Sequence, residues 1–186
     1  MEVEIKIPIR EVFLDEDPQT YITNKICVPD EEIIQTDIYF QSPIKDFQRT
    51  DEALRIRQIH TKEDSQLVEV TYKGPKIGKS MKIREELSIF TEKYSNTLKI
   101  FERLGFKAVA DVKKSRVNWS KNSVKISLDE VIGLGTFIEA EMVVNKKPNH
   151  ISSSKKVIID LLKEIFPKWS EKEERNSYLE LLAREM

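Results

Sequence analysis

The chain is poor in the residues that most metal centres and covalent catalysts use. Its 186 residues include one cysteine, Cys27, and two histidines, His60 and His150. One cysteine excludes an internal disulfide and a cysteine-based zinc site, and it is most simply a reduced, buried thiol in cytoplasm. Two histidines leave little for a histidine-rich metal site or a Ser-His-Asp triad. Any metal or catalytic chemistry must therefore use carboxylates, lysines and arginines.

Long apolar runs and a large net charge are also missing. No stretch is long and apolar enough to span a bilayer and no export signal is recognisable, so we expect a cytoplasmic protein without a membrane partner. Lys+Arg 31 nearly balances Asp+Glu 32, for a formal net charge of −1. No global field therefore draws the protein to nucleic acid, and an anionic ligand would need a local basic cluster. No linker divides the chain, which predicts one domain over residues 1–186.

What the sequence does contain is strand-like alternation. In "MEVEIKIPI", Glu2, Glu4 and Lys6 fall on one face of an extended strand and the apolar residues on the other. Similar segments recur, and many strands joined by short turns favour an antiparallel sheet closed into a barrel. We expect strands near residues 2–13, 33–41, 53–61, 66–74, 80–90, 107–120, 123–130 and 136–146.

Helical patterns interrupt or follow these strands. Asp17 and Pro18 in "DPQTYITNKI" are typical of a helix N-terminus. "TEKYSNTLKIFERLGF" has a cap near Thr91 or Ser95 and ends at Gly105. Amphipathic helices can cover the outside of a barrel, and we expect them near residues 92–104, 151–166 and 176–186.

The segment "GPKIGKS", residues 74–80, resembles a phosphate-binding P-loop but does not meet its requirements. A P-loop has four residues between its glycines, and this segment has three. A helix should follow it, whereas Met81, Ile83, Leu87 and Ile89 share one face of an extended strand. We therefore predict a turn between two strands.

The polar faces of the predicted strands are concentrated in charged residues. A face exposed to water needs only a mixture of polar residues, which is the usual explanation for a single such strand. Here two E-x-E pairs and two basic pairs recur, which indicates a charged interior covered outside by helices. Charges of both signs are tolerated inside only when paired or bound to ligand. Carboxylate pairs select Mg²⁺ or Mn²⁺ and rows of Arg and Lys select phosphate oxygens, so the pattern predicts a site for a metal-bound polyphosphate.

These segments also resemble the CYTH domain, the triphosphate tunnel metalloenzyme superfamily. The E-x-E-x-K of Glu2, Glu4 and Lys6 is similar to its N-terminal signature, and the similarity continues in order through "TDIYF", "ALRIR", "VTYKGPK", "KIREEL", "LGF", "VKKSR", "ISLDEVIGLGTFIEAE" and "SYLELL". It covers nearly the whole chain and is closest to the class IV adenylate cyclase branch. The resemblance implies an α+β, mainly β fold: an eight-stranded antiparallel closed barrel around a charged tunnel, with helices packed outside, as a single CYTH domain.

The resemblance further implies a set of site residues. The ligands of Mg²⁺ or Mn²⁺ would be Glu2, Glu4, Asp129, Glu139 and Glu141. The triphosphate would be bound by Lys6, Arg55, Arg57, Lys73, Lys114 and Arg116, with Lys82 and Arg84 at the rim or floor of the tunnel. Catalysis would depend on Glu2, Glu4, Lys6, Arg57, Lys73 and Arg116.

Other residues in or near the matched segments receive less specific roles. Glu86 either orients a neighbouring base or forms a structural ion pair. Asp37 and Tyr39 are interpreted as turn and packing residues more than as ligands. Lys76 is expected to be a solvated loop charge. Both tryptophans are expected in the core or its cover.

Three functions fit such a tunnel. A metal-dependent triphosphatase would hydrolyse a small-molecule triphosphate, and a nucleotidyl cyclase would use the ribose 3′-hydroxyl to attack the α-phosphorus of ATP. A polyphosphate sensor is less compatible with five carboxylates. We find no constellation of residues for adenine near the tunnel strands, so we favour the triphosphatase over the adenylate cyclase. The resemblance also suggests a homodimer.

Overall fold

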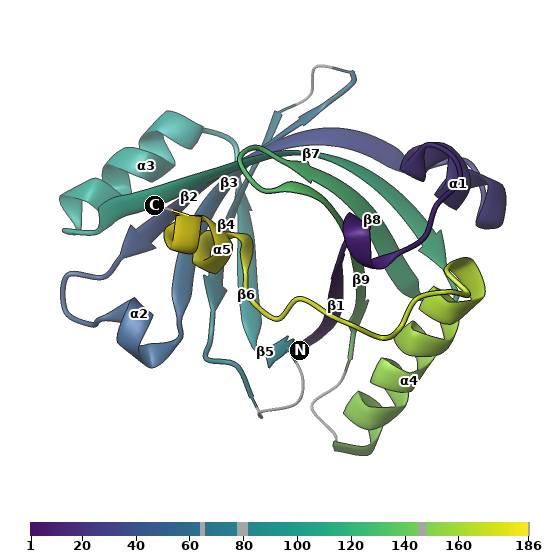
Figure 1. Ribbon diagram of the computed structural model, residues 1–186. Coiled ribbons are helices and arrows are strands. Elements are labelled where there is room, and N and C mark those ends of the chain that lie inside the picture. Colours follow the sequence, from purple (N-terminus) through teal and green to yellow (C-terminus); the bar gives the residue numbers. More distant parts are fainter. Residues whose placement is uncertain (64–65, 78–81, 145–147, 186) are drawn as a thin grey trace.

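Nine strands form the body of the fold in residues 1–63, 66–77, 82–144 and 148–185, the part of the chain that the computed structural model describes (Figure 1). They are β1 (Glu2–Pro8), β2 (Glu31–Gln41), β3 (Ala53–Thr61), β4 (Gln66–Lys73), β5 (Lys82–Arg84), β6 (Glu86–Thr91), β7 (Lys107–Lys121), β8 (Val124–Val131) and β9 (Gly135–Val143). Their order in the sheet is β5-β1-β9-β8-β7-β2-β3-β4-β6, with antiparallel neighbours throughout. The sheet curls into a nearly closed barrel, which confirms the predicted mainly β architecture.

The barrel closes through β5 and β6, which only Glu85 separates. β5 pairs with β1 and β6 pairs with β4, so this short stretch meets both ends of the sheet. The backbone N–H of Gly74 donates to the carbonyl of Glu85 over 2.9 Å, so the backbone carbonyl at the break between the two strands has a hydrogen-bond partner. One strand predicted near 80–90 is therefore two, and this accounts for nine strands rather than eight. Residues 80 and 81 lie outside the described residues.

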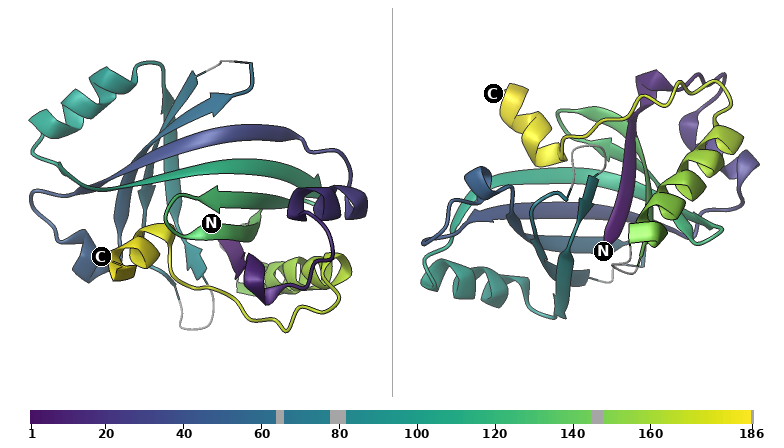
Figure 2. Two further views of the ribbon diagram at one scale, coloured as in Figure 1. Left: turned by 45° about the horizontal axis from the view of Figure 1, so that its top comes forward. Right: turned by 90° about the horizontal axis from the view of Figure 1, so that it is seen from below.

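The helices of the described residues are α1 (Pro18–Lys25), α2 (Phe47–Thr50), α3 (Tyr94–Arg103), α4 (Pro148–Ile165) and α5 (Tyr178–Glu185), with a 3₁₀ turn, η1 (Ile9–Glu11). They confirm the three helices predicted near 92–104, 151–166 and 176–186. In Figures 1 and 2, α3 and α4 lie on opposite sides of the barrel, and the chain after α4 crosses the barrel to reach α5. No helix within these residues is both long and apolar enough to cross a membrane.

The helix starts were predicted with mixed success. Asp17 caps α1 as expected, since its carboxylate accepts the Thr20 backbone N–H over 3.0 Å. The cap predicted for α3 is wrong: Lys93 occupies that position without a side-chain hydrogen bond. Thr91 instead ends β6, and its hydroxyl lies 2.8 Å from that of Thr97. The hydroxyl therefore joins strand to helix rather than capping the helix.

The apolar core lies outside the barrel wall, under the helices. Val3, Ile5 and Ile7 of β1 belong to one buried cluster with Ile158 and Leu162 of α4. Both tryptophans join this cluster, which confirms their predicted core position. A second cluster packs the outer faces of β3 and β4 against α3. Because the apolar faces point outward to the helices, the charged faces are turned inward.

Other sequence predictions need correction. The first strand was predicted to run to residue 13 but ends at Pro8, because η1 follows at once. Cys27 was predicted to be buried and is exposed, since it lies in the connection between α1 and β2 rather than in either element. Gly74 precedes a strand, β5, and not a helix, which agrees with the rejection of a P-loop. Residues 78–81 lie outside the described part of the chain.

Candidate functional site

A cavity of about 550 Å³ runs through the barrel and collects the charged faces of its strands. Alternation places the charges there, because every second residue of a strand faces the lumen. The lining includes most of the predicted site residues: Glu2, Glu4, Lys6, Arg55, Arg57, Lys73, Arg84, Lys114, Arg116, Glu139 and Glu141. The backbone of Lys82 lies in β5, and its side chain is outside what the structure describes. Asp129 is buried directly behind this lining.

Asp129 organises one group of cations in the tunnel wall. It is fully buried, and its carboxylate accepts Lys114 Nζ over 2.7 Å and both Nε and Nη2 of Arg116 over 2.6 Å. Arg116 faces Asp129 in the register of β7 with β8, so the pairing follows from the strand alignment. Arg116 also forms an ion pair with Glu139. Burial lowers the pKa of Lys114 to about 8, with Arg116 acting in the same direction.

Asp37 organises a second group of cations on the neighbouring strands β2 and β3. Its two carboxylate oxygens accept Nε and Nη2 of Arg57 over 2.6 and 2.7 Å, and Arg55 Nη1 lies 3.7 Å away. Burial alone would raise the pKa of the Asp37 carboxyl, but Arg57 and Arg55 hold it well below its ordinary value. Asp37 therefore lies within β2 and lines the tunnel, and the interpretation as a turn residue is wrong. Tyr39 is buried and lines the tunnel as well.

The carboxylates of β1 and β9 form an acidic region in the same lumen. Burial, then Glu141 and Glu86, raise the pKa of Glu2 to about 8. Burial also raises the pKa of Glu141 and is the largest effect there; Arg116 acts against it, and Glu139 and Glu4 act with it. Within the described residues, no three His, Cys, Asp or Glu side chains already stand in a metal-binding arrangement. Carboxylates that repel one another are nevertheless the oxygen donors that a divalent cation neutralises, so these residues fit Mg²⁺ or Mn²⁺.

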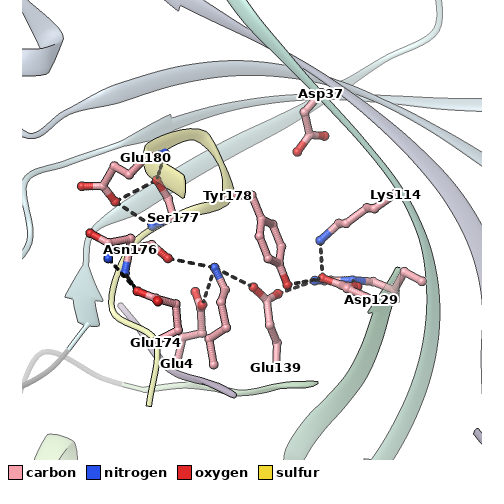
Figure 3. Close-up of polar contacts among 12 residues, drawn as sticks. Glu4, Asp37, Lys114, Asp129, Glu139, Glu174, Asn176, Ser177, Tyr178 and Glu180 are labelled. Carbon is pink, nitrogen blue, oxygen red and sulfur yellow. Dashed lines mark hydrogen bonds and ion pairs between the residues drawn. The ribbon is translucent and has the colours of Figure 1, made fainter. Parts of the chain in front are cut away.

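Lys6 joins this acidic region to the C-terminal segment. Its Nζ, in a residue only 2% exposed, lies 3.2 Å from Glu139 and 3.8 Å from Glu4. It donates to the carbonyl of Asn176 over 3.2 Å and lies 3.7 Å from the ring centre of Tyr178. Figure 3 shows Tyr178 pointing into the tunnel toward Asp129, and its hydroxyl donates to that carboxylate over 2.9 Å.

The β4–β5 side of the tunnel is also linked to the C-terminal helix. Lys76 Nζ lies 2.7 Å from Glu180 of α5 and 3.4 Å from Asp51, so it is an ion-paired contact rather than the solvated charge that was predicted. Lys73 donates to Glu86 over 2.6 Å. Glu86 therefore forms the ion pair that was one of the two roles left open by the sequence.

A second cavity, of about 920 Å³, adjoins one end of the tunnel. The two cavities share five lining residues: Tyr39, Ala53, Arg84, Ser177 and Leu179. Phe47, Val109 and Leu182 are among its apolar lining residues, and its carboxylates are Asp46, Asp51, Glu52, Asp111 and Glu180. Apolar walls with few cations suit an organic group better than a phosphate.

Several residues of this site were missed or undervalued from the sequence. Tyr178 lies on a helix, so strand alternation could not reveal it, although "SYLELL" carries part of the family resemblance. Asp37 and Gln35 share the alternating face of β2 with Tyr39, and that periodicity was the available signal. Glu69 lies 3.1 Å from Arg55 on the neighbouring strand and had the same signal.

Glu2→Gln is expected to make the stability of the metal-free protein less dependent on pH. The pKa of Glu2 is about 8 in the folded chain and 4.5 in its ordinary state. When folding raises the pKa of a carboxyl, the free energy of unfolding falls as the pH rises between the two pKa values. The reason is that the folded state binds the proton more tightly and must release it. In chelator, the melting temperature of the wild type should fall from about pH 5 to about pH 8.5 more than that of Glu2→Gln.

The control is Glu130→Gln, an exposed residue near the end of β8, which should keep the wild-type pH dependence. Added Mg²⁺ should raise the wild-type melting temperature most at the higher pH, because the cation replaces the proton among the carboxylates. Identical pH profiles for the wild type and Glu2→Gln would contradict the assignment of Glu2 to this repulsive cluster.

An antiparallel barrel with cations and carboxylates facing one lumen places this chain among the tunnel-fold proteins. The model of the CYTH domain matches residues 1–178, and the chain belongs to the CYTH family. A provisionally named adenylate cyclase of Methanocaldococcus jannaschii is 41% identical over 149 residues, 79% of this chain and 80% of that protein. CYTH proteins act on phosphoanhydrides and generally use divalent metal ions.

Solved structures share the fold. A protein from Pyrococcus horikoshii OT3 aligns over 100% of both chains with a TM-score of 0.86 and 37% identity. A provisionally named adenylyl cyclase from Hippeastrum covers 100% of this chain and 96% of its own, with a TM-score of 0.65 and 17% identity. That protein is described as having a dominant triphosphatase activity. At such low identity the similarity establishes the fold alone.

Proposed function

We propose that this protein hydrolyses a triphosphate substrate inside the tunnel in a reaction that depends on a divalent metal. The observation that carries the proposal is the gathering of two Asp-anchored groups of cations and an acidic region around one cavity of about 550 Å³. Cations alone would suffice to bind an anion. Carboxylates in the same lumen are useful when a metal ion accompanies the substrate.

The basic residues would bind the phosphate chain. A guanidinium has five N–H donors, and Arg57 directs only two of them at Asp37. The remaining donors of Arg57 and those of Arg55 can meet phosphate oxygens from β3, and Lys114 and Arg116 can do so from β7. The anchoring carboxylates hold these cations in place before substrate arrives, which lowers the cost of ordering them.

The acidic residues would hold Mg²⁺ or Mn²⁺. Glu2, Glu4, Glu139 and Glu141 are the proposed ligands, and Asp129 would join them by exchanging one of its cation partners. When bound, the metal supplies charge neutralisation and polarisation of the phosphoryl group. Lys6, between Glu4 and Glu139, is placed to hold a phosphate oxygen near that region.

An adenylate cyclase is the alternative. A cyclase must hold a base and a ribose in addition to the phosphates, and the sequence showed no place for them. The adjoining cavity of about 920 Å³ offers such a place. The name of the relative from M. jannaschii also favours this alternative. Cyclisation would use the same cations and carboxylates, so products have to distinguish the two reactions.

Purified protein with Mg²⁺ or Mn²⁺ is expected to release orthophosphate from inorganic triphosphate, a substrate that has no ribose and cannot cyclise. Chelator should remove the activity, and Ca²⁺ should support little turnover because its looser coordination positions the phosphates poorly. Pyrophosphate should compete, since it keeps most contacts of the phosphate chain. The measurement is chromatography of the products from triphosphate and from ATP in separate reactions.

The outcomes separate the two functions. Cyclic AMP as the main product of ATP, with inorganic triphosphate left intact, would replace hydrolysis by cyclisation. Full activity in excess chelator would refute the dependence on metal.

A further inference from the structure

Gln35 is a neutral side chain among the charges of the tunnel. It lies on β2, two residues before Asp37, lines the tunnel cavity and is 3% exposed. Its side-chain oxygen Oε1 is buried and has no hydrogen-bond partner among the described residues. Buried polar atoms are almost always hydrogen-bonded in native proteins. An acceptor of this kind in a substrate tunnel therefore indicates a partner that arrives from the cavity.

The surroundings of Gln35 leave its oxygen available. In the sheet register it lies beside Lys114 of β7 and Ile59 of β3. Lys114 directs its ammonium group to Asp129 over 2.7 Å. Asp37, the next residue on the same face, is bound to Arg57. A carboxylate at position 35 would attract Lys114 and repel the substrate, whereas the amide oxygen stays uncharged.

The missing partner must carry an O–H or N–H group. The phosphate chain at neutral pH offers only oxygen acceptors. An amide oxygen can also ligate a metal ion, but the proposed metal ligands lie on β1, β8 and β9, whereas Gln35 lies on β2 beside the ammonium group of Lys114. The nucleophile does offer an O–H, and it must lie beside a phosphorus atom inside this lumen. Ile33 and Ile59, which line the same cavity, are the apolar neighbours of Gln35 and limit competition from bulk water on that side.

We propose that Gln35 is a further catalytic residue, whose side-chain oxygen accepts a hydrogen bond from the nucleophile and aligns that nucleophile with the phosphorus; the inference rests on the proposed function. In hydrolysis the nucleophile is water. Its oxygen forms the new bond to the terminal phosphorus, and the bond from that phosphorus to the bridging oxygen breaks. Pyrophosphate leaves with the electron pair, one proton stays on orthophosphate and the other passes to pyrophosphate. The amide orients the water and takes no proton from it.

Gln35→Leu tests this role, because leucine is of similar size, matches the isoleucine neighbours and removes the acceptor. We expect kcat for triphosphate hydrolysis to fall about 100-fold, the effect of a misaligned nucleophile. KM and inhibition by pyrophosphate should change less than about twofold, because the phosphate contacts remain. The melting temperature should not fall. Gln58→Leu, on the outer, half-buried face of β3, is the matched control and should retain wild-type kinetics.

The kinetic outcomes decide the proposal. A raised KM with unchanged kcat would mean that the amide donates to phosphate, and unchanged kinetics would mean that it has no role; either result overturns the proposal. If the wild type makes cyclic AMP instead, hydrolysis fails as the function. A fall in the kcat of cyclisation at constant KM would then still support Gln35, with the ribose hydroxyl as its donor.

A structure of the full chain with Mg²⁺ and a non-hydrolysable triphosphate analogue gives a test that does not need turnover. A water or ribose hydroxyl within hydrogen-bond distance of Gln35 Oε1 and beside a phosphorus atom is the expected result. A phosphate oxygen in that place, or an amide with no contact to either, would overturn the proposal.

Discussion

Glu4→Gln is expected to abolish turnover and leave the fold intact. Glu4 lies on the lumen face of β1, beside Lys6 and opposite Glu141 in the register with β9. The amide keeps the shape of the side chain but removes a charged oxygen from the proposed metal site. Metal stabilisation of the reacting phosphoryl group contributes several kcal/mol, so its loss should lower kcat/KM by about 1,000-fold or more.

The measurements are kcat/KM at saturating Mg²⁺, metal affinity by calorimetry and the melting temperature in chelator. Glu130→Gln, at an exposed residue near the end of β8, is the control and should retain activity. A Glu4→Gln protein with wild-type kcat/KM would remove Glu4 from the metal site. A large fall in melting temperature would instead show that Glu4 is structural.

Asp129→Ala is expected to destabilise the protein by about 3–5 kcal/mol, the cost of removing one partner from a buried ion pair. Lys114 and Arg116 are 3% and 5% exposed, and both direct donors at Asp129. The hydroxyl of Tyr178 would lose its acceptor as well. The variant leaves two buried cations with less negative charge around them, and denaturant unfolding in chelator measures the result.

Pyrophosphate should restore part of the lost stability, because an anion bound in the tunnel can neutralise the same two cations. We expect it to raise the melting temperature of Asp129→Ala more than that of the wild type, relative to each protein without ligand. Asp160→Ala on α4 is the control: its exposed pair with Lys156 should contribute less than about 1 kcal/mol. Equal stabilities of the wild type and Asp129→Ala would contradict the organising role of Asp129.

Prediction from the sequence succeeded where one periodicity decided the outcome. Glu2, Glu4 and Lys6 share a face whatever the strand pairs with, and the same holds for Arg55 and Arg57. One further step was needed to decide which face points into the barrel: the argument that so many charges need an interior covered by helices. The buried cluster between β1 and α4 confirms the outward direction of the apolar face.

Prediction failed where the environment came from another part of the chain. Nothing local to Asp37 shows that Arg57, twenty residues away, will hold both of its oxygens. Tyr178 reaches Asp129 only because the C-terminal segment crosses the barrel. Cys27 was assigned to the core from its residue type, although its position in a connection decides its exposure.

The amino-acid sequence by itself determined the strands, their two faces and the kinds of charge that enter the lumen, because side-chain alternation is a property of each strand alone. The tertiary structure decided which charges meet. Sheet register set Arg116 against Asp129 and placed Gln35 beside Lys114 and Ile59. Register and the path of the C-terminal segment depend on contacts between distant residues, so pairing, burial and pKa, and with them the chemistry of the tunnel, arise only when the barrel closes.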